Sequence, residues 1–291
     1  MDHIIDEVAL YVVQYLYNEL TEIVLSYLVA FNVNSLIFKK SFGDFEGYDY
    51  CDINIYKNKV YLLMCKNGLM IIYDMITDKT IYFNTNLEFI YSFCNIDDNE
   101  IIFVTDLYLY IYKYDIIDTK ISILDIKQIF NNDNYANLCY FKGNIIFKAG
   151  DYINIHNLKY NSVNSLIYDK FSCWMCLYNE YLHVLSSGDS IIRIYNMNDK
   201  KFIKSISLPF DFSINSHTRN IFVDNTGFYI EFSTYINVFN YDGEYIRRID
   251  KPYLNSVFHI DSDKIYLVRK FEKSIDVSIF QQKLKYVFGK K

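Results

Sequence analysis

The chain has 291 residues, a formal net charge of −6 and an isoelectric point near 5.4. General binding to nucleic acid or to an anionic membrane needs a basic surface, so this charge balance argues against both classes of partner. Apolar residues make up 52% of the sequence, yet no run approaches the roughly 20 apolar residues that a membrane-spanning helix needs.

The N-terminal part of the chain differs from the rest. Residues 2–31 contain no Gly or Pro, and their polar positions recur at steps that a helix brings to one side. We therefore expect a helical N-terminal segment over residues 1–34 and a second domain over residues 35–291. Alternatively, residues 28–32 belong to an eroded copy of the repeat described below. Residues 35–42 are a strand candidate that either closes the second domain beside its last repeat or belongs to this eroded copy.

The first clear repeat unit surrounds a hairpin. Residues 59–65 form a β-branched and aromatic run, residues 66–68 are a Lys-Asn-Gly turn, and residues 69–73 form a second run. A run that ends before residue 57 and another at residues 80–83 give four short strands. Four antiparallel strands in about 40 residues are typical of one blade of a β-propeller.

A five-residue phrase of apolar, any, apolar, ring and short polar side chain occurs six times. Its closing positions are 41, 42, 39, 44 and 41 residues apart. A sandwich or a barrel does not predict such a fixed step, so we expect an all-β fold, a β-propeller of six four-stranded blades, or seven with the eroded copy. The predicted structural anchors of the repeat are Tyr73, Asp74, Tyr114, Asp115, His156, Asn157, Tyr195, Asn196, Phe239, Asn240, Phe280 and Gln281.

The best single copy of the phrase lies in residues 187–196, which have the sequence Ser-Gly-Asp-Ser-Ile-Ile-Arg-Ile-Tyr-Asn, and continues into residues 200–203. This stretch is similar to the third strand of a WD repeat and the turn into the fourth strand. The chain therefore resembles a degenerate WD-repeat-type β-propeller, with Tyr, Phe or His in the place of the Trp of that family.

The order of apolar residues in the N-terminal segment is similar to an F-box. That motif is a helical module that docks on the adaptor of a ubiquitin ligase, and it often precedes a propeller that binds the substrate. The resemblance implies an adaptor contact through residues 4–31. The alternative is a helix that packs on the ring and has no other role. The adaptor-binding side chains implied by the resemblance are Leu10, Val13, Leu16 and Leu20.

Motif searches point to no catalytic, cofactor or metal site. The C-x-x-C pair of Cys173 and Cys176 lies in an expected strand, where an offset of three places the sulfurs on opposite faces, so buried structural thiols are favoured. His156 takes the ring position of its repeat, which favours a packed side chain over a ligand. There is no P-loop, G-x-G-x-x-G or G-x-S-x-G, and the acidic clusters lie at expected turns.

Several features indicate an intracellular, cytoplasmic protein. The six Cys residues have no disulfide-framework spacing, no Asn-x-Ser/Thr sequence occurs, and the acidic N-terminus lacks the basic region of a secretory signal. The 30 Tyr and 23 Phe, beside 9 Gly and 2 Pro, fit a genome rich in A and T, as in some large DNA viruses. For a viral protein the expected location is the host cytoplasm.

The leading functional prediction is a non-catalytic scaffold for protein–protein interaction, with protein partners on the propeller face. Loops rich in Tyr and Asn supply aromatic anchors with polar tips, which are common at such interfaces. A more specific alternative is an F-box-type substrate receptor of a ubiquitin ligase. The opposing class is an enzyme whose residues converge on the central channel from several blades.

Overall fold

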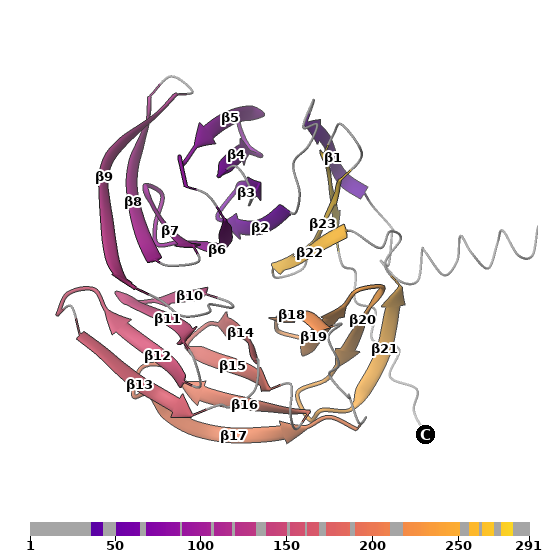
Figure 1. Cartoon of the computed structure of the whole chain (residues 1–291). Helices are drawn as coiled ribbons and strands as arrows, with labels where there is room; N and C mark the ends of the chain where they lie inside the picture. Colours follow the sequence, from indigo (N-terminus) through magenta and orange to yellow (C-terminus); the bar gives the residue numbers. More distant parts are fainter. Residues whose placement is uncertain are drawn as a thin grey trace, which may run out of the picture.

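The computed structural model describes residues 36–281, except for 43–50, 65–67, 88, 106–107, 118–119, 132–137, 150–151, 161, 169–172, 187–189, 210–217, 251–255, 262–263 and 271–274. Within these residues the chain forms 24 β-strands, which pair into six four-stranded sheets (Figure 1). The predicted N-terminal helices and the eroded copy at residues 28–32 lie outside the described residues.

Five of the sheets use four strands that follow one another in the chain, and the sixth takes one strand from the N-terminal side. In each sheet the first-named strand lies at the centre of the molecule. The sheets are β2 (Cys51–Tyr56), β3 (Lys59–Met64), β4 (Leu69–Asp74) and β5 (Lys79–Asn84); β6 (Ile90–Asn95), β7 (Glu100–Thr105), β8 (Tyr108–Ile117) and β9 (Lys120–Asn131); β10 (Leu138–Phe141), β11 (Asn144–Ala149), β12 (Tyr152–Asn157) and β13 (Ser162–Tyr168); β14 (Cys173–Tyr178), β15 (Tyr181–Ser186), β16 (Ile191–Asn196) and β17 (Lys201–Ser207); β18 (Thr218–Val223), β19 (Phe228–Phe232), β20 (Tyr235–Phe239) and β21 (Tyr245–Asp250); and β22 (Ser256–Asp261), β23 (Lys264–Lys270), β24 (Ile275–Gln281) and β1 (Leu36–Phe42).

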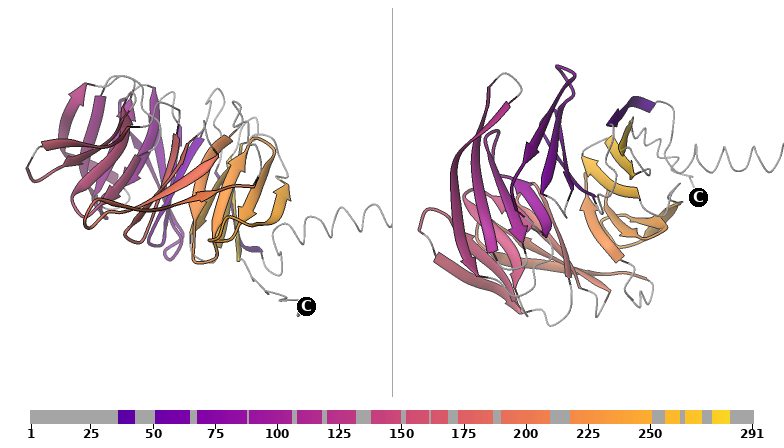
Figure 2. Two further views of the ribbon diagram at one scale, coloured as in Figure 1. Left: turned by 90° about the horizontal axis from the view of Figure 1, so that it is seen from below. Right: turned by 45° about the horizontal axis from the view of Figure 1, so that its top comes forward.

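The inner strands form a closed ring. Strands β2, β6, β10, β14, β18 and β22 contact one another in this order, and β22 contacts β2. Seen from the side, the sheets stand next to one another in a flattened disc (Figure 2). This arrangement confirms an all-β propeller with four-stranded blades, and it brings residues about 40 positions apart into equivalent places around one axis.

The sixth sheet differs from the other five because its outer strand precedes all of the others in sequence. β1 pairs antiparallel with β24, from Leu36 opposite Phe280 to Phe42 opposite Ile275. The strand candidate at residues 35–42 therefore closes the ring beside the last repeat. The expectation of six or seven blades that are each a consecutive unit of the chain was wrong, since only five blades are built wholly from consecutive strands and the sixth sheet is completed by β1. The antiparallel pairing of β1 with β24 closes the ring.

The apolar core lies between the sheets. Strands β3 and β4 are buried along nearly their whole length, because neighbouring sheets cover both of their faces. The outer strand β5 instead alternates buried and exposed residues. Between the first two sheets the rings of Phe103 and Tyr112 meet edge to face, with centroids 5.1 Å apart. Bulky aromatic side chains thus fill the space between sheets that radiate from a common centre.

Candidate functional site in the central channel

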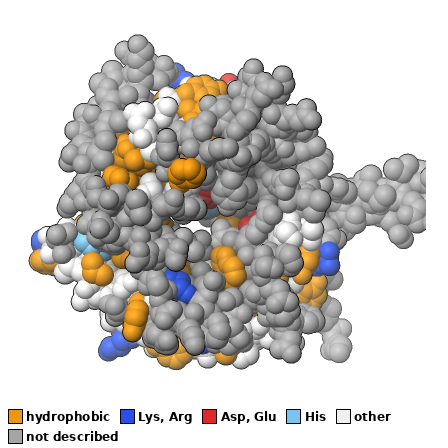
Figure 3. Space-filling view, in the orientation of Figure 1, with side chains coloured by type: hydrophobic (Ala, Val, Ile, Leu, Met, Phe, Trp, Pro, Cys, Tyr) orange, Lys and Arg blue, Asp and Glu red, His pale blue; other side chains and the backbone are white. Residues whose placement is uncertain are grey.

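A cavity of about 430 Å³ lies at the centre of the ring, and inner strands of all six sheets line it. A narrow opening is visible at the middle of the face in Figure 3, with red acidic atoms beside it. The volume is within the range of small-molecule sites in proteins. Among the described residues, the lining combines one carboxyl group, one imidazole, three amides, three thiols and the hydroxyls of Tyr56, Ser92 and Tyr140 with apolar side chains, and it includes no Lys or Arg.

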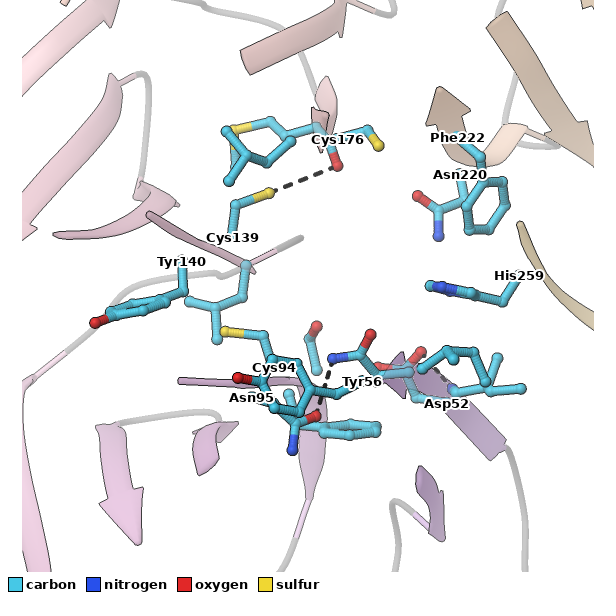
Figure 4. Close-up of a pocket in the computed structure, with 18 of the residues that line it drawn as sticks. Asp52, Tyr56, Cys94, Asn95, Cys139, Tyr140, Cys176, Asn220, Phe222 and His259 are labelled. Atoms are coloured by element: carbon cyan, nitrogen blue, oxygen red, sulfur yellow. Dashed lines mark hydrogen bonds between the residues drawn. The ribbon is translucent and has the colours of Figure 1, made fainter. Parts of the chain in front are cut away.

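The residue at one position of the inner strand lines the cavity in all six sheets. This residue pairs with the third residue of the neighbouring strand in every sheet but the fifth, where it pairs with the second residue of β19, so the six positions are rotational equivalents. Figure 4 shows the thiol-bearing residues on one side of the cavity and Asp52, Asn220 and His259 on the other. The six equivalent residues are Asn54 opposite Tyr61, Cys94 opposite Ile102, Cys139 opposite Ile146, Cys176 opposite His183, Phe222 opposite Tyr229 and His259 opposite Tyr266.

Asp52 is the carboxyl group of the channel. Its Oδ1 accepts a hydrogen bond from the backbone N–H of Ile53 at 2.9 Å. Burial raises the pKa of Asp52 to about 7, and the charge of Glu231 adds to this rise. Hydrogen bonds from the backbone N–H groups of Ile53 and Phe93 and from the hydroxyl of Ser92 lower the pKa and so oppose the rise. Loss of hydration is the dominant cause, since a carboxylate is poorly solvated in a narrow channel. Asp52 is therefore close to half protonated near neutral pH.

The imidazole and two of the thiols that line the channel are neutral at physiological pH. Burial lowers the pKa of His259 to about 4, so its imidazole carries no charge at pH 7. Burial raises the pKa of the Cys176 thiol to about 12 and that of the Cys94 thiol well above its ordinary value. The Cys139 thiol lies 4.0 Å from the backbone oxygen of Met175. Thiols that stay protonated are poor nucleophiles and poor metal ligands.

The predicted repeat anchors lie on the third strands, away from the channel lining. In five sheets the phrase has the same register against the second strand. The closing residue of the phrase lies opposite the first residue of the second strand in four sheets: Asp74 opposite Lys59, Asn157 opposite Asn144, Asn196 opposite Tyr181 and Gln281 opposite Lys264. In the fifth sheet the ring residue Phe239 lies opposite Phe228, as the ring residue Tyr73 lies opposite Val60 in the first.

In the second sheet the same register falls two residues earlier than the sequence indicated. Lys113 lies opposite Glu100 and Tyr112 opposite Ile101, so these two residues take the places predicted for Tyr114 and Asp115. The Lys113 ammonium is 3.6 Å from the Glu100 carboxylate, a cross-strand ion pair that favours this alignment. Because Lys is not a short polar residue, the sequence pattern alone selected the wrong pair.

The short polar side chains that close the phrase hold the turn into the outer strand. Asp74 Oδ1 accepts hydrogen bonds from the backbone N–H groups of Ile76 at 2.9 Å and Thr77 at 3.1 Å. Asn196 Oδ1 accepts one from the N–H of Asn198 at 2.8 Å. Such side-chain turns explain why Asp and Asn recur at this position. Equivalent bonds run to Asn157 Oδ1 from Tyr160 and to Asn240 Oδ1 from Asp242 and Glu244.

The remaining predicted site residues have different outcomes. His156 is buried in the sheet and does not line the channel. The implied adaptor-binding residues lie outside the described residues. Within the part of the chain that the structure describes, no group of three or more His, Cys, Asp or Glu could hold a metal ion. No helix among the described residues is long and apolar enough to cross a membrane. The predicted adaptor-binding residues are Leu10, Val13, Leu16 and Leu20.

Sequence reasoning missed the channel residues because the inner strands carry no repeated phrase. Asp52 has no acidic counterpart at the equivalent position of the other sheets; Ser92 and Asn220 take that place in the second and fifth sheets. The one available signal was the recurrence of Cys94, Cys139 and Cys176 at a similar point of three successive units. That signal becomes visible only when the inner strands are aligned by their pairing.

The fold and its channel define the protein as a β-propeller. No protein-family model and no curated protein matches the chain. Solved structures do resemble it: a luciferin-regenerating enzyme has a TM-score of 0.61 at 10% identity, covering 84% of this chain and 96% of that one. Regucalcin, a calcium-binding protein from Agrobacterium tumefaciens C58, has a TM-score of 0.55 at 9% identity, covering 83% and 94%. The AfRom2 CNH domain has a TM-score of 0.53 at 11% identity, covering 80% and 81%.

These comparisons correct one prediction from the sequence. The chain was expected not to be an enzyme, but the same architecture occurs in a luciferin-regenerating enzyme. A propeller of this kind can therefore carry catalysis, and the exclusion was wrong. Identities of about 10% establish a shared fold only, so the chemistry has to be argued from the channel itself.

Proposed function

We propose that the protein binds a small organic molecule in the central channel and that Asp52 exchanges a proton with it. One observation carries the proposal: a carboxyl group whose pKa is about 7 faces a cavity of about 430 Å³. A shift of this size, caused mainly by burial, is more common at functional sites than elsewhere on a protein. An acid with a pKa near the working pH can both donate and accept a proton efficiently.

The lining restricts the class of ligand. Among the described residues, no cationic side chain faces the channel, and the imidazole of His259 and the thiols of Cys94 and Cys176 are neutral near pH 7. A phosphate or carboxylate would find no counter-charge and would meet the partly ionised Asp52. A neutral or cationic molecule is compatible with this field. The amides of Asn54 and Asn220 supply hydrogen-bonding groups on the polar side, while Leu138 and Met175 contribute apolar contact.

Within this site Asp52 would act as a general acid or base toward a group held across the channel. The bonds from Ile53 and Ser92 keep its carboxyl group on the wall between the first two sheets. The neutral imidazole of His259 offers a hydrogen-bond donor or acceptor without charge. The fold supplies a rigid wall, and this favours precise placement of the reacting group.

The test is a thermal-shift screen of neutral, cationic and anionic metabolites at pH 6 and pH 8, followed by calorimetry of the hits. Asp52→Asn should weaken binding at least tenfold and remove its pH dependence between these values. Asp242→Asn, at an exposed turn position, is the matched control and should leave binding unchanged. The proposal fails if the hits are mainly anions, or if Asp52→Asn binds the ligands as tightly as the parent protein.

A second proposal is a protein-interaction scaffold of WD-repeat-like type, including its F-box-type form inside cells. It is supported by large apolar side chains that are exposed on the outer strands, such as Phe202 and Ile203 on β17, 54% and 50% exposed. Such side chains are frequent at protein interfaces. Co-purification with a ubiquitin-ligase adaptor, lost on Leu16→Asp, is the expected result for the F-box form. If the protein and the adaptor do not associate at micromolar concentration, the F-box form of the proposal is ruled out. If a Phe202→Ser/Ile203→Ser variant still binds its protein partner, β17 is ruled out as the contact surface.

A further inference from the structure

The channel lining begins with a polar level. Asp52, Ser92 and Asn220 are each the first residue of their strand in the lining. They take equivalent places in the first, second and fifth sheets, opposite Leu63, Val104 and Glu231 of the neighbouring strands. This level of the cavity therefore offers a carboxyl group, a hydroxyl and an amide.

The next level of the channel is divided into two halves. Three consecutive sheets contribute one thiol each, from β6, β10 and β14, and these strands contact one another in this order. The other three sheets contribute an amide, an aromatic ring and an imidazole. Figure 4 shows the thiols on the opposite side of the cavity from Asp52 and Asn220. The thiols are Cys94, Cys139 and Cys176, called the thiol wall below, and the other residues are Asn54, Phe222 and His259.

The thiol wall is an apolar surface near neutral pH. Burial raises the pKa of Cys176 to about 12 and that of Cys94 well above its ordinary value, so both thiols keep their protons. The Sγ of Cys139 lies 4.0 Å from the backbone oxygen of Met175, a weak contact between the third and fourth sheets. A protonated thiol behaves as a small hydrophobic group with a weak donor. Hydrocarbon therefore gains more than a polar group from contact with this wall.

The polar side of the channel favours a cation that can donate several hydrogen bonds. Asp52 supplies the negative charge of the described lining. Asn54 lies two residues further on the same face of β2, and its Nδ2 donates to Asn95 Oδ1 at 3.1 Å, so its own Oδ1 is the other arm of the amide. An amide oxygen only accepts, whereas an ammonium group has three N–H donors. Charge-assisted bonds from an ammonium to a carboxylate are among the strong hydrogen bonds.

Resting on the channel function proposed above, we propose that the ligand is an amphiphilic amine, with its protonated nitrogen against Asp52 and its hydrocarbon body against the thiol wall. The nitrogen supplies the counter-charge that Asp52 lacks among the described lining residues, and the body loses water against the three thiols. An amino acid does not suit this site, because its carboxylate would meet Asp52. A polyamine does not suit it either, because it would place a second charge on an apolar surface. The volume of about 430 Å³ accommodates a body of several carbon atoms.

The experiment uses four probes with the full chain at pH 8, followed by calorimetry. Hexylamine, hexanol and hexanoate share one chain and differ in the head, whereas ethylamine shares the head and has a shorter chain. Hexylamine should bind at least tenfold more tightly than hexanol, and hexanoate should not bind. It should also exceed ethylamine by more than tenfold, because each buried CH₂ contributes about fourfold in affinity. Asp52→Asn should reduce the affinity for hexylamine to that for hexanol, and Asp242→Asn, at an exposed turn, should change neither.

Two substitutions at one position test where the hydrocarbon body lies. Cys139→Leu fills part of the space beside the thiol wall and should weaken hexylamine at least tenfold while leaving ethylamine unchanged. Cys139→Ala is the matched control, since it is also apolar but smaller, and it should retain the preference for hexylamine. Protection of the other thiols is a second measurement that needs no substitution. Hexylamine, but not ethylamine, should slow the labelling of Cys94 and Cys176 by iodoacetamide, followed by mass spectrometry.

The outcomes separate this proposal from the channel function on which it rests. Equal affinities for hexylamine and hexanol, or for hexylamine and ethylamine, would overturn the amphiphilic amine, and so would unchanged thiol labelling with hexylamine bound. If hexylamine does not bind but other compounds of the screen bind in a way that depends on Asp52, the ligand class is wrong and the channel function stands. If no compound binds, or if binding does not depend on Asp52, both proposals fail.

Discussion

Replacement of Asp52 by Asn should make the protein more stable at pH 8. The pKa of this carboxyl group rises by about 3 on folding, from 3.8 to about 7. At 1.36 kcal/mol for each pKa unit, ionisation of Asp52 destabilises the folded state by up to about 4 kcal/mol. The true cost is smaller than this limit, because the side chain is only half-buried and borders the channel. Asn keeps the shape and an acceptor oxygen for Ile53 but carries no charge.

The dependence on pH follows from the direction of the shift. Below about pH 4 Asp52 is protonated in the folded and unfolded states, and its ionisation contributes nothing. Between about pH 4 and pH 7 the folded state holds a proton that the unfolded state has released, so stability falls as the pH rises. Above about pH 7 the full cost is present. The advantage of Asp52→Asn should therefore grow from pH 5 to pH 8.

Urea unfolding at pH 5, 6, 7 and 8 measures this directly for the parent protein and the variant. Asp74→Asn is the control, because its effect on stability should be the same at all four pH values. Burial tends to raise the pKa of Asp74, but hydrogen bonds from the N–H groups of Thr77 and Ile76 outweigh it and leave the pKa lowered. Its contribution is present above the unfolded pKa and is lost as the pH falls. A difference between Asp52→Asn and the parent that stays constant from pH 5 to pH 8 would refute the reasoning.

Three further outcomes are expected. Gly68→Ala should destabilise the fold by more than about 3 kcal/mol, because Gly68 has φ +62° and an added Cβ would collide with Leu87 O and Thr85 Oγ1. Gly143→Ala, at φ +78° with open space around it, should cost only about 1 kcal/mol. Equal losses of stability for the two variants in urea unfolding would contradict this prediction. Cys94 and Cys176 should react slowly with iodoacetamide at pH 8, since burial raises the pKa of both thiols; mass spectrometry of the folded protein that finds rapid labelling would disprove it. A chain that begins at residue 43 should melt well below one that begins at residue 36, because only the latter keeps the pairing of β1 with β24; similar melting temperatures would show that the closure adds little stability.

The sequence was sufficient for the class of fold because its evidence is local. Strand and turn signals depend on neighbouring residues, and a fixed spacing of turn-forming Asp and Asn reports a repeated unit. The pairing of Asp74 with Lys59 and of Asn157 with Asn144 shows that the phrase marks one register in different sheets. The same local rule failed in the second sheet, where Lys113 lies opposite Glu100 and so takes the place at which the pattern expects a short polar residue.

The amino-acid sequence by itself determined the strands, their turns and the repeat, since these follow from contacts over a few residues. Only the tertiary structure decided what the channel contains and how the ring is closed. The pKa of Asp52 depends on desolvation and on Ser92, Phe93 and Glu231, which lie from 40 to 179 positions away in the chain. Closure of the ring likewise joins residue 42 to residue 275. Such environments arise when distant segments exclude water together, and no local pattern encodes that juxtaposition.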